Sequence, residues 1–200
     1  MVARRLRPTI YEHMDAHPLS PILTTQRLSL RLPVPKEATQ ITNYILRNRD
    51  FLEATEPVRP NTYYTDEFWV RQLWHNQEDA ARGTAFRFFV FHGDTIVGVV
   101  NLTNIRRGAL QAANIGYALD QTAQGNGWMT EALTAVIDFA FGELGLHRIM
   151  ADHLPDNHRS AAVLARLGFE IEGYAKDFLK MSDGKWHDHV RTALVNRRRR

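Results

Sequence analysis

The spacing of apolar residues in the first half of the chain predicts strands alternating with helices. Leu28, Leu30 and Leu32 alternate with polar residues, which predicts a half-buried strand over 27–32. Apolar residues then recur at helical spacing over 36–48. The segment 50–65 has two prolines and no clean period, so we expect a loop that leads into a helix over 66–80.

The second half predicts a strand meander, two further helices and a terminal hairpin. Turns at His92-Gly93-Asp94 and Arg106-Arg107-Gly108 separate the runs of the meander. The clearest helix has an apolar stripe from Met129 to Leu144. The expected elements are strands over 86–91, 95–103, 111–119, 147–153, 169–181 and 186–195, and helices over 129–144 and 159–167.

A glycine turn, Gly125-Asn126-Gly127, separates the strand that ends at Leu119 from the most apolar helix. Glycines let a ligand approach the unpaired N–H groups and the partial positive charge of a helix start, so we expect an anion there, such as a pyrophosphate. The chain has no GxxxxGK[ST] motif and lacks the third glycine of a dinucleotide fingerprint. Neither a P-loop nor a Rossmann site fits.

Residues 124–133, QGNGWMTEAL, resemble the acetyl-coenzyme A signature of the GNAT acetyltransferases. Met129 stands where many members have Gly or Ala, but its backbone N–H remains available. The form G-x-G-x-M-x-E-A-L is similar to the branch that contains the RimJ and RimL ribosomal-protein acetyltransferases. A second block, LPDNHRSAAVLARLGFEIEG over 154–173, resembles the family as well.

This resemblance covers almost the whole chain and implies a fold. The order β-α-α-β-β-β-α-β-α-β-β is that of GNAT proteins: a mixed α/β (α+β) fold with a seven-stranded mixed sheet and helices on both faces. In that fold the fourth and fifth strands splay apart and the pantetheine arm of the coenzyme lies in the gap. We therefore expect a GNAT domain over 25–196, an N-terminal extension over 1–24 and a basic tail over 197–200.

The resemblance also implies residues for acetyl transfer from acetyl-CoA. Backbone N–H groups of 117–119 would polarise the acetyl carbonyl, with Leu119 as the foremost donor. Ser160 would hydrogen-bond the departing sulfur, although serine in a first helical turn is often only a local cap. Leu164 occupies the position of the tyrosine acid found in many members. The implied coenzyme-binding residues are Tyr117, Ala118, Leu119, Gln124, Gly125, Asn126, Gly127, Trp128, Met129, Thr130, Asn157 and Ser160.

The general base and the acceptor site are less defined. Asp152 lies where some N-terminal acetyltransferases place a glutamate, with Glu56 and Asp177 as further candidates. Asp177 is also expected among the residues that bind the acceptor. The segment Glu56-Pro57-Val58-Arg59 resembles a RimJ-type motif, so Glu56 and Arg59 are expected in the acceptor wall; as an alternative they are exposed residues of a proline-stiffened loop. No metal site is expected, because His187-x-His189 alone does not make one.

Energetics favour an α-amine as acceptor. An α-amine costs about 0.5 kcal/mol to deprotonate near neutral pH and a lysine about 4 kcal/mol. Together with the RimJ-like hairpin around 173–177 and 186–190, this predicts acetylation of a protein N-terminus, Ala or Ser, most simply of a ribosomal protein. The alternatives are a small-molecule amine, or a ribosome-associated factor with a vestigial site.

Composition restricts location and partners. The chain contains no cysteine, so it has no disulfides or thiol nucleophile, and it shows no membrane span or signal peptide; we expect a cytoplasmic protein, as a monomer or homodimer. Seven terminal arginines, at 4, 5, 7 and 197–200, exceed the net charge of +3, so the remaining chain is acidic. They are either solvated ends or arms that contact RNA weakly.

Overall fold

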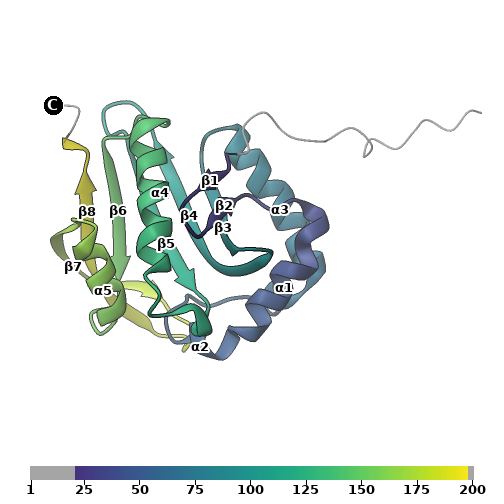
Figure 1. Ribbon diagram of the computed structural model, residues 1–200. Helices are drawn as coiled ribbons and strands as arrows, with labels where there is room; N and C mark the ends of the chain where they lie inside the picture. Colours follow the sequence, from purple (N-terminus) through teal and green to yellow (C-terminus); the bar gives the residue numbers. More distant parts are fainter. Residues whose placement is uncertain (1–20, 198–200) are drawn as a thin grey trace, which may run out of the picture.

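The computed structural model describes residues 21–197 as one sheet with helices on both faces (Figure 1). The elements are β1 (Leu23–Thr24), β2 (Ser29–Arg31), η1 (Pro35–Glu37), α1 (Ala38–Arg47), α2 (Arg49–Glu53), η2 (Asn61–Tyr64), α3 (Asp66–Ala81), β3 (Phe86–His92), β4 (Thr95–Arg106), β5 (Ala112–Leu119), η3 (Gln121–Ala123), α4 (Trp128–Gly142), β6 (Arg148–His153), α5 (His158–Arg166), β7 (Glu170–Lys180) and β8 (Trp186–Val195).

The sheet is mixed, which confirms the expected fold class. Its strand order is β1-β2-β3-β4-β5-β6-β8-β7, and only β5 and β6 pair in parallel. The described part of the chain has eight strands where seven were expected. The additional strand, β1, has two residues, too few to give an alternating pattern in the sequence.

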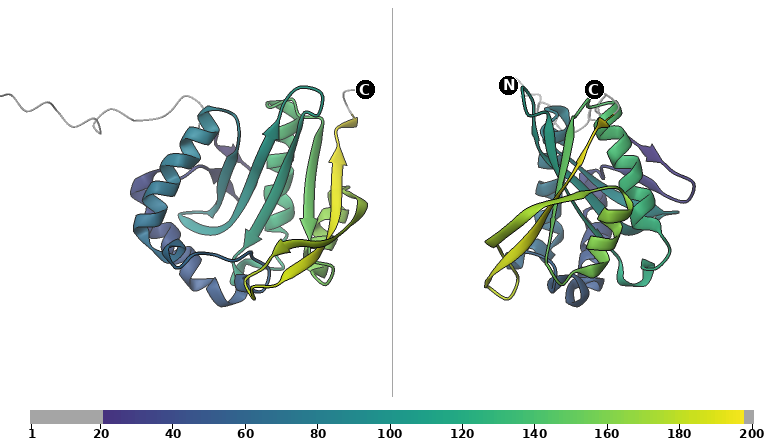
Figure 2. Two further views of the ribbon diagram at one scale, coloured as in Figure 1. Left: turned by 180° about the vertical axis from the view of Figure 1, so that it is seen from behind. Right: turned by 90° about the vertical axis from the view of Figure 1, so that its left-hand side faces the viewer.

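Alternate residues of the central strands pack into two cores, one on each face of the sheet. On the α4 face, Phe88 and Val100 join the core formed by α4 and α5. On the α1 face, Phe89 and Val99 pack with α1 and α3, around the ring of Tyr44. The right-hand view of Figure 2 separates these two layers. Buried residues on both faces explain why β3 is apolar almost throughout.

Strands β5 and β6 diverge, as predicted for the fourth and fifth strands of the fold. They pair through three positions at the start of each strand, Ala112–Asn114 with Arg148–Met150. Beyond Asn114, β5 remains paired with β4 up to Leu119, while β6 remains paired with β8 up to His153. The gap therefore opens toward the carboxyl ends of both strands.

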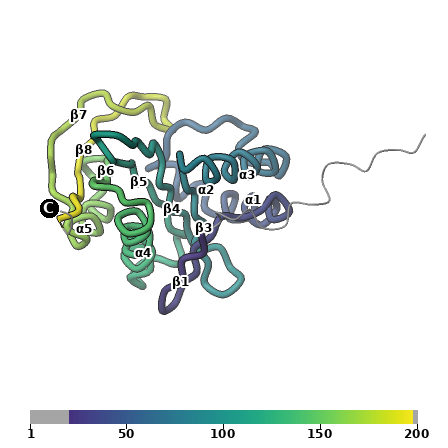
Figure 3. Tube along the Cα trace, turned by 90° about the horizontal axis from the view of Figure 1, so that it is seen from above, coloured from purple at the N-terminus to yellow at the C-terminus, as the bar shows by residue number. Residues whose placement is uncertain are grey.

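The segment 50–65 differs from the expected loop, because it contains α2 and η2. Each is at most five residues long, which is too short to produce a readable helical period. Residues 53–58, here called the strap, run across to the end of β7. Ser182 donates its N–H to Glu56 O and its hydroxyl to Glu53 O, and Pro57 bridges to Met181. Figure 3 shows the two segments side by side.

Candidate active site

The turn before α4 exposes backbone donors, as its glycines predicted. Gly125 and Gly127 have φ values of 79° and 74°, a left-handed conformation that favours glycine. Gly127 is the N-cap of α4, and the first bond of the helical ladder runs from Glu131 N–H to Gly127 O. The N–H groups of 128–130 precede that ladder, so they are free for an anion.

A charged cluster from the start of the chain fixes this turn in place. Arg27 binds the Glu131 carboxylate at 2.6 Å and donates to Asn126 O at 3.0 Å. Thr25 donates its hydroxyl to the same carboxylate. Burial would raise the pKa of Glu131, but the bonds from Thr25 and Arg27 outweigh it and lower that pKa. Residues 25–27 thus belong to the site's framework.

The edge of β5 presents backbone N–H groups to the gap. Asp120 donates its N–H to Val97 O, and Leu119 pairs opposite Gly98. In this antiparallel register, even-numbered residues of β5 bond to β4, and the N–H groups of Tyr117 and Leu119 point away from β4 into the gap. Two of the three predicted donors therefore face the gap, whereas the N–H of Ala118 faces β4.

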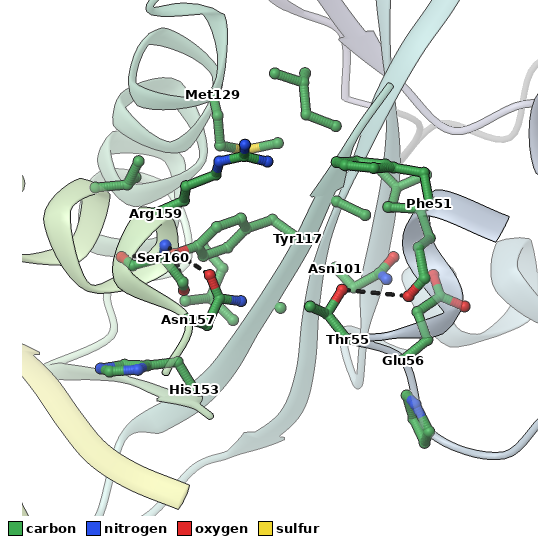
Figure 4. A pocket seen from close by; sticks show the side chains of 18 of the residues that line it. Phe51, Thr55, Glu56, Asn101, Tyr117, Met129, His153, Asn157, Arg159 and Ser160 are labelled. Atoms are coloured by element: carbon green, nitrogen blue, oxygen red, sulfur yellow. Dashed lines mark hydrogen bonds between the residues drawn. The ribbon is translucent and has the colours of Figure 1, made fainter. Parts of the chain in front are cut away.

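Ser160, Asn157 and Tyr117 meet on the α4 face of the gap (Figure 4). The Asn157 side chain caps α5 by accepting the Ser160 N–H at 3.1 Å. The hydroxyls of Tyr117 and Ser160 lie 2.7 Å apart. Burial raises the pKa of Tyr117 to about 12, and the bond to Ser160 opposes that rise only in part. Tyr117 is therefore protonated at neutral pH.

One cavity of about 1790 Å³ runs through the gap and reaches both faces of the sheet. On the α4 face it is lined by the glycine turn, by Tyr117 and by α5. On the α1 face its walls are the strap, α3 and the β7–β8 hairpin. Figure 4 shows Asn101, Phe51, Thr55 and Glu56 across the strands from Ser160. Of the predicted coenzyme-binding residues, only Asn126 is absent from the lining; its side chain bonds to Ala123 O.

The family is decided by a comparison with protein-family models. Residues 27–170 match the acetyltransferase (GNAT) domain. The chain belongs to the GNAT acetyltransferase family. It is 45% identical over 175 residues to the [ribosomal protein uS5]-alanine N-acetyltransferase of Escherichia coli (strain K12), an alignment covering 86% of this chain and 90% of that protein.

Solved structures of GNAT proteins agree with this assignment. The ribosomal-protein-S5-alanine acetyltransferase of Vibrio fischeri superimposes with a TM-score of 0.85 at 38% identity, covering 88% of this chain and 97% of the other. RimJ of Mycobacterium smegmatis, solved in complex with CoA-disulfide, has a TM-score of 0.81 at 30% identity, covering 86% and 83%. This protein is thus an acetyltransferase.

The three carboxylates considered as the GNAT base lie in different surroundings. Asp152 lines the cavity but is bonded to Arg191 Nε at 3.4 Å. Glu56 lines the cavity on the strap, with Arg59 Nε also at 3.4 Å. Asp177 is exposed at an irregularity of β7, with φ of 46°, and lies outside the lining. The structure therefore brings Asp152, Glu56 and Arg59 to the cavity, but not Asp177.

Several cavity residues are not among those that the sequence motifs predicted. The motif implies a role for the backbone of Tyr117 but gives no signal for its hydroxyl. Arg159 and Arg166 on α5 also line the cavity, and Arg166 reaches Thr130 Oγ1 at 3.4 Å, beside the glycine turn. Their spacing of two helical turns places them on one face of α5, a pattern that was available in the sequence.

Within residues 21–197, no group of three or more His, Cys, Asp or Glu side chains has the geometry of a metal site. His187 is bonded through Nε2 to Asp183 at 2.9 Å. No helix in the described residues has the length and apolar character needed to cross a membrane.

Proposed function

We propose that this enzyme transfers the acetyl group of acetyl-CoA to the N-terminal α-amine of a protein, with alanine or serine as the first residue and a ribosomal protein as the acceptor. The observation that carries the proposal is the cavity that passes from the glycine turn, through the gap, to the opposite face. The proposal is also supported by the relative named as a ribosomal protein alanine N-acetyltransferase, whose alignment covers 86% of this chain.

The coenzyme side fits acetyl-CoA through three groups of this chain. N–H groups at the start of α4 bind the pyrophosphate, where no Cβ of residues 125 or 127 intervenes. Arg166 adds a positive charge beside Thr130. Asn157 and the edge of β5 hold the pantetheine arm in the gap.

Acetyl transfer uses the edge of β5 and the start of α5. The N–H of Leu119, which points into the gap, stabilises negative charge on the carbonyl oxygen of the thioester. The acceptor nitrogen attacks the carbonyl carbon, the C–N bond forms and the C–S bond breaks. Ser160 donates its hydroxyl proton to the departing thiolate and takes up the proton that the acceptor nitrogen releases, and the hydroxyl of Tyr117 at 2.7 Å supports it.

The acceptor side fits an extended chain end. Its walls include the polar side chains of Glu56, Arg59 and Asn101 besides apolar ones, so both the amine and the peptide groups of a chain end meet polar partners. An α-amine requires about 3 to 4 kcal/mol less than lysine to become neutral near pH 7, which favours it as the acceptor.

The partner and location follow from the same proposal. A ribosomal acceptor places the enzyme in the cytoplasm, as a monomer or a homodimer. Weak RNA contact through the terminal arginines also stays a prediction. Arg197 pairs with Glu170 at 2.7 Å, and the other terminal arginines lie outside the described residues.

Mass spectrometry of mixed acceptors tests the proposal. The enzyme is incubated with acetyl-CoA and three acceptors: an Ala- or Ser-initiated peptide, the same peptide with a blocked α-amine and a free lysine, and a small amine. We expect an acetyl group on the α-amine of the first. Acetylation of only the lysine peptide or the small amine would contradict it.

A further inference from the structure

Carboxylates and histidines are the side chains at the cavity wall that can take the proton of the acceptor amine. Asp152 is paired with Arg191, and Glu56 with Arg59. Each of these contacts joins one carboxylate oxygen to an arginine Nε at 3.4 Å. The remaining titratable side chains of the cavity include two histidines, His153 and His189, both buried.

The two histidines face opposite sides of the sheet. Side chains alternate along a strand, and His153 follows Ile149 and Ala151, which pack in the α4-face core. His189 alternates with Val190, the register partner of His153, and shares its face with Arg191, the partner of Asp152. His189 therefore lies on the α1 face, where the acceptor enters.

Strand register places His189 beside the opening of the gap. The last pair between β6 and β8 is His153 with Val190, and β6 ends there. His189 is one residue further along β8, past the end of β6, and it lines the same cavity as Leu119. At that height β6 no longer lies between β8 and β5.

A hydrogen bond to the backbone sets the tautomer of the neutral His189 imidazole. Its Nδ1 lies 3.2 Å from the carbonyl oxygen of His187. A carbonyl oxygen can only accept, so Nδ1 carries the hydrogen and the neutral ring has its lone pair on Nε2. No residue in 21–197 bonds to Nε2, and the ring of Phe178 supports the imidazole from one side at 5.4 Å.

We infer that His189 is the general base of the acceptor site. Its Nε2 accepts a proton from the acceptor ammonium, directly or through one water, and this frees the lone pair that attacks the carbonyl carbon. As the C–N bond forms and the C–S bond breaks, the second proton of the nitrogen passes through the hydroxyl of Ser160 to the thiolate. The inference rests on the proposed function for the identity of the amine. The charged groups near His189 at the cavity wall are already paired: Arg191 with Asp152, and Glu56 with Arg59. Asp188, on the opposite face of β8, accepts from Tyr174.

The test compares His189→Gln with His187→Gln, whose Nε2 is held by Asp183 and whose side chain lies outside the cavity lining. At pH 7 we expect kcat/KM for an Ala-initiated peptide to fall about 100-fold in His189→Gln and little in His187→Gln. At pH 9 the deficit shrinks to about ten-fold or less, because most α-amines are then neutral without a base. Stabilisation by acetyl-CoA is unchanged in both variants.

Two results would overturn the inference: similar rates for the two variants at pH 7, or a His189→Gln deficit that is the same at both pH values. If His189→Gln unfolds, His189→Asn is measured in its place under the same criteria. A wild-type enzyme that acetylates only lysine or small amines refutes the proposed acceptor instead. The two variants are then compared on that amine, and similar rates there would refute His189 as the base.

Discussion

At the scale of single residues, Ser160 has the most direct part in the transfer. Replacing Ser160 by alanine removes the hydroxyl that lies 2.7 Å from Tyr117 but keeps the N–H that Asn157 accepts. We expect kcat to fall about 10- to 100-fold, because the thiolate loses its proton donor, while acetyl-CoA binding changes little. Steady-state kinetics with a thermal shift titration measures both. Unchanged turnover would remove Ser160 from the mechanism.

Gly98 is required for a different reason, since it allows β4 and β5 to approach closely. A Cβ at this position would lie 2.7 Å from the backbone oxygen of Ala118. Gly98→Ala therefore shifts the edge of β5 that carries the Leu119 N–H. We expect a loss of about 1 to 3 kcal/mol in the free energy of unfolding and lower kcat. Urea denaturation and kinetics measure these effects. In the control, Gly116→Ala, a Cβ has no atom within 4 Å, so stability should change less.

Residue chemistry was partly predictable from the sequence. The motif around Asn157 and Ser160 predicted two neighbours correctly, because their spacing sets a helix cap that depends on local bonds only. The hydroxyl of Tyr117 reaches Ser160 from a strand 43 residues away, a contact that no local pattern encodes. The exclusion of Asp177 depends likewise on an irregularity within β7.

At the scale of elements, Asp120 fixes the end of β5 against α1. Its carboxylate accepts from Arg47 at 2.7 Å and from Asn48 at 3.0 Å, and it caps η3 through Thr122. Burial would raise its pKa, but these hydrogen bonds outweigh that effect and lower it to about 2, from an ordinary 3.8. A lowered pKa means that this carboxylate stabilises the fold while it is ionised.

The sign of the pH effect follows directly. The contribution of Asp120 is complete above about pH 4 and is lost as the pH falls toward 2. Asp120→Asn should therefore cost roughly 2 kcal/mol at pH 7, and its difference from wild type should shrink below pH 4. Urea denaturation at pH 7 and pH 3 measures this. Asp138→Asn, on the exposed side of α4, is the control and should change little at either pH. If Asp120→Asn lowered the free energy of unfolding by the same amount at both pH values, the ionised carboxylate of Asp120 would not be the stabilising group.

Element prediction succeeded where periods were long and failed where elements were short. The apolar stripe of α4 and the turns between β3, β4 and β5 predicted the bounds of these four elements to within a few residues. The helices α2 and η2 depend on tertiary bonds such as Trp69 Nε1 to Tyr63 O, which the sequence pattern does not reveal. The two-residue β1 exists only through its pairing with β2.

At the scale of the whole molecule, the sheet consists of two parts joined by a short seam. Three parallel pairs connect β1–β5 to β6–β8 at β5 and β6. A ligand that fills the gap contacts both parts, so acetyl-CoA at 100 to 1,000 times its Kd should stabilise the fold by about 3 to 4 kcal/mol. A thermal shift titration measures this. Absence of any shift would favour a vestigial site.

The register of β5 has one more consequence, for the exchange of its amide hydrogens with solvent. The N–H groups of Gly116 and Ala118 bond to β4, while those of Tyr117 and Leu119 point into the gap. Neighbouring amides of one strand should therefore alternate between slow and fast deuterium uptake in the free enzyme. Coenzyme in the gap would slow deuterium uptake only at the amides of Tyr117 and Leu119. The exchange rates along β5 would therefore show, residue by residue, whether the coenzyme is bound.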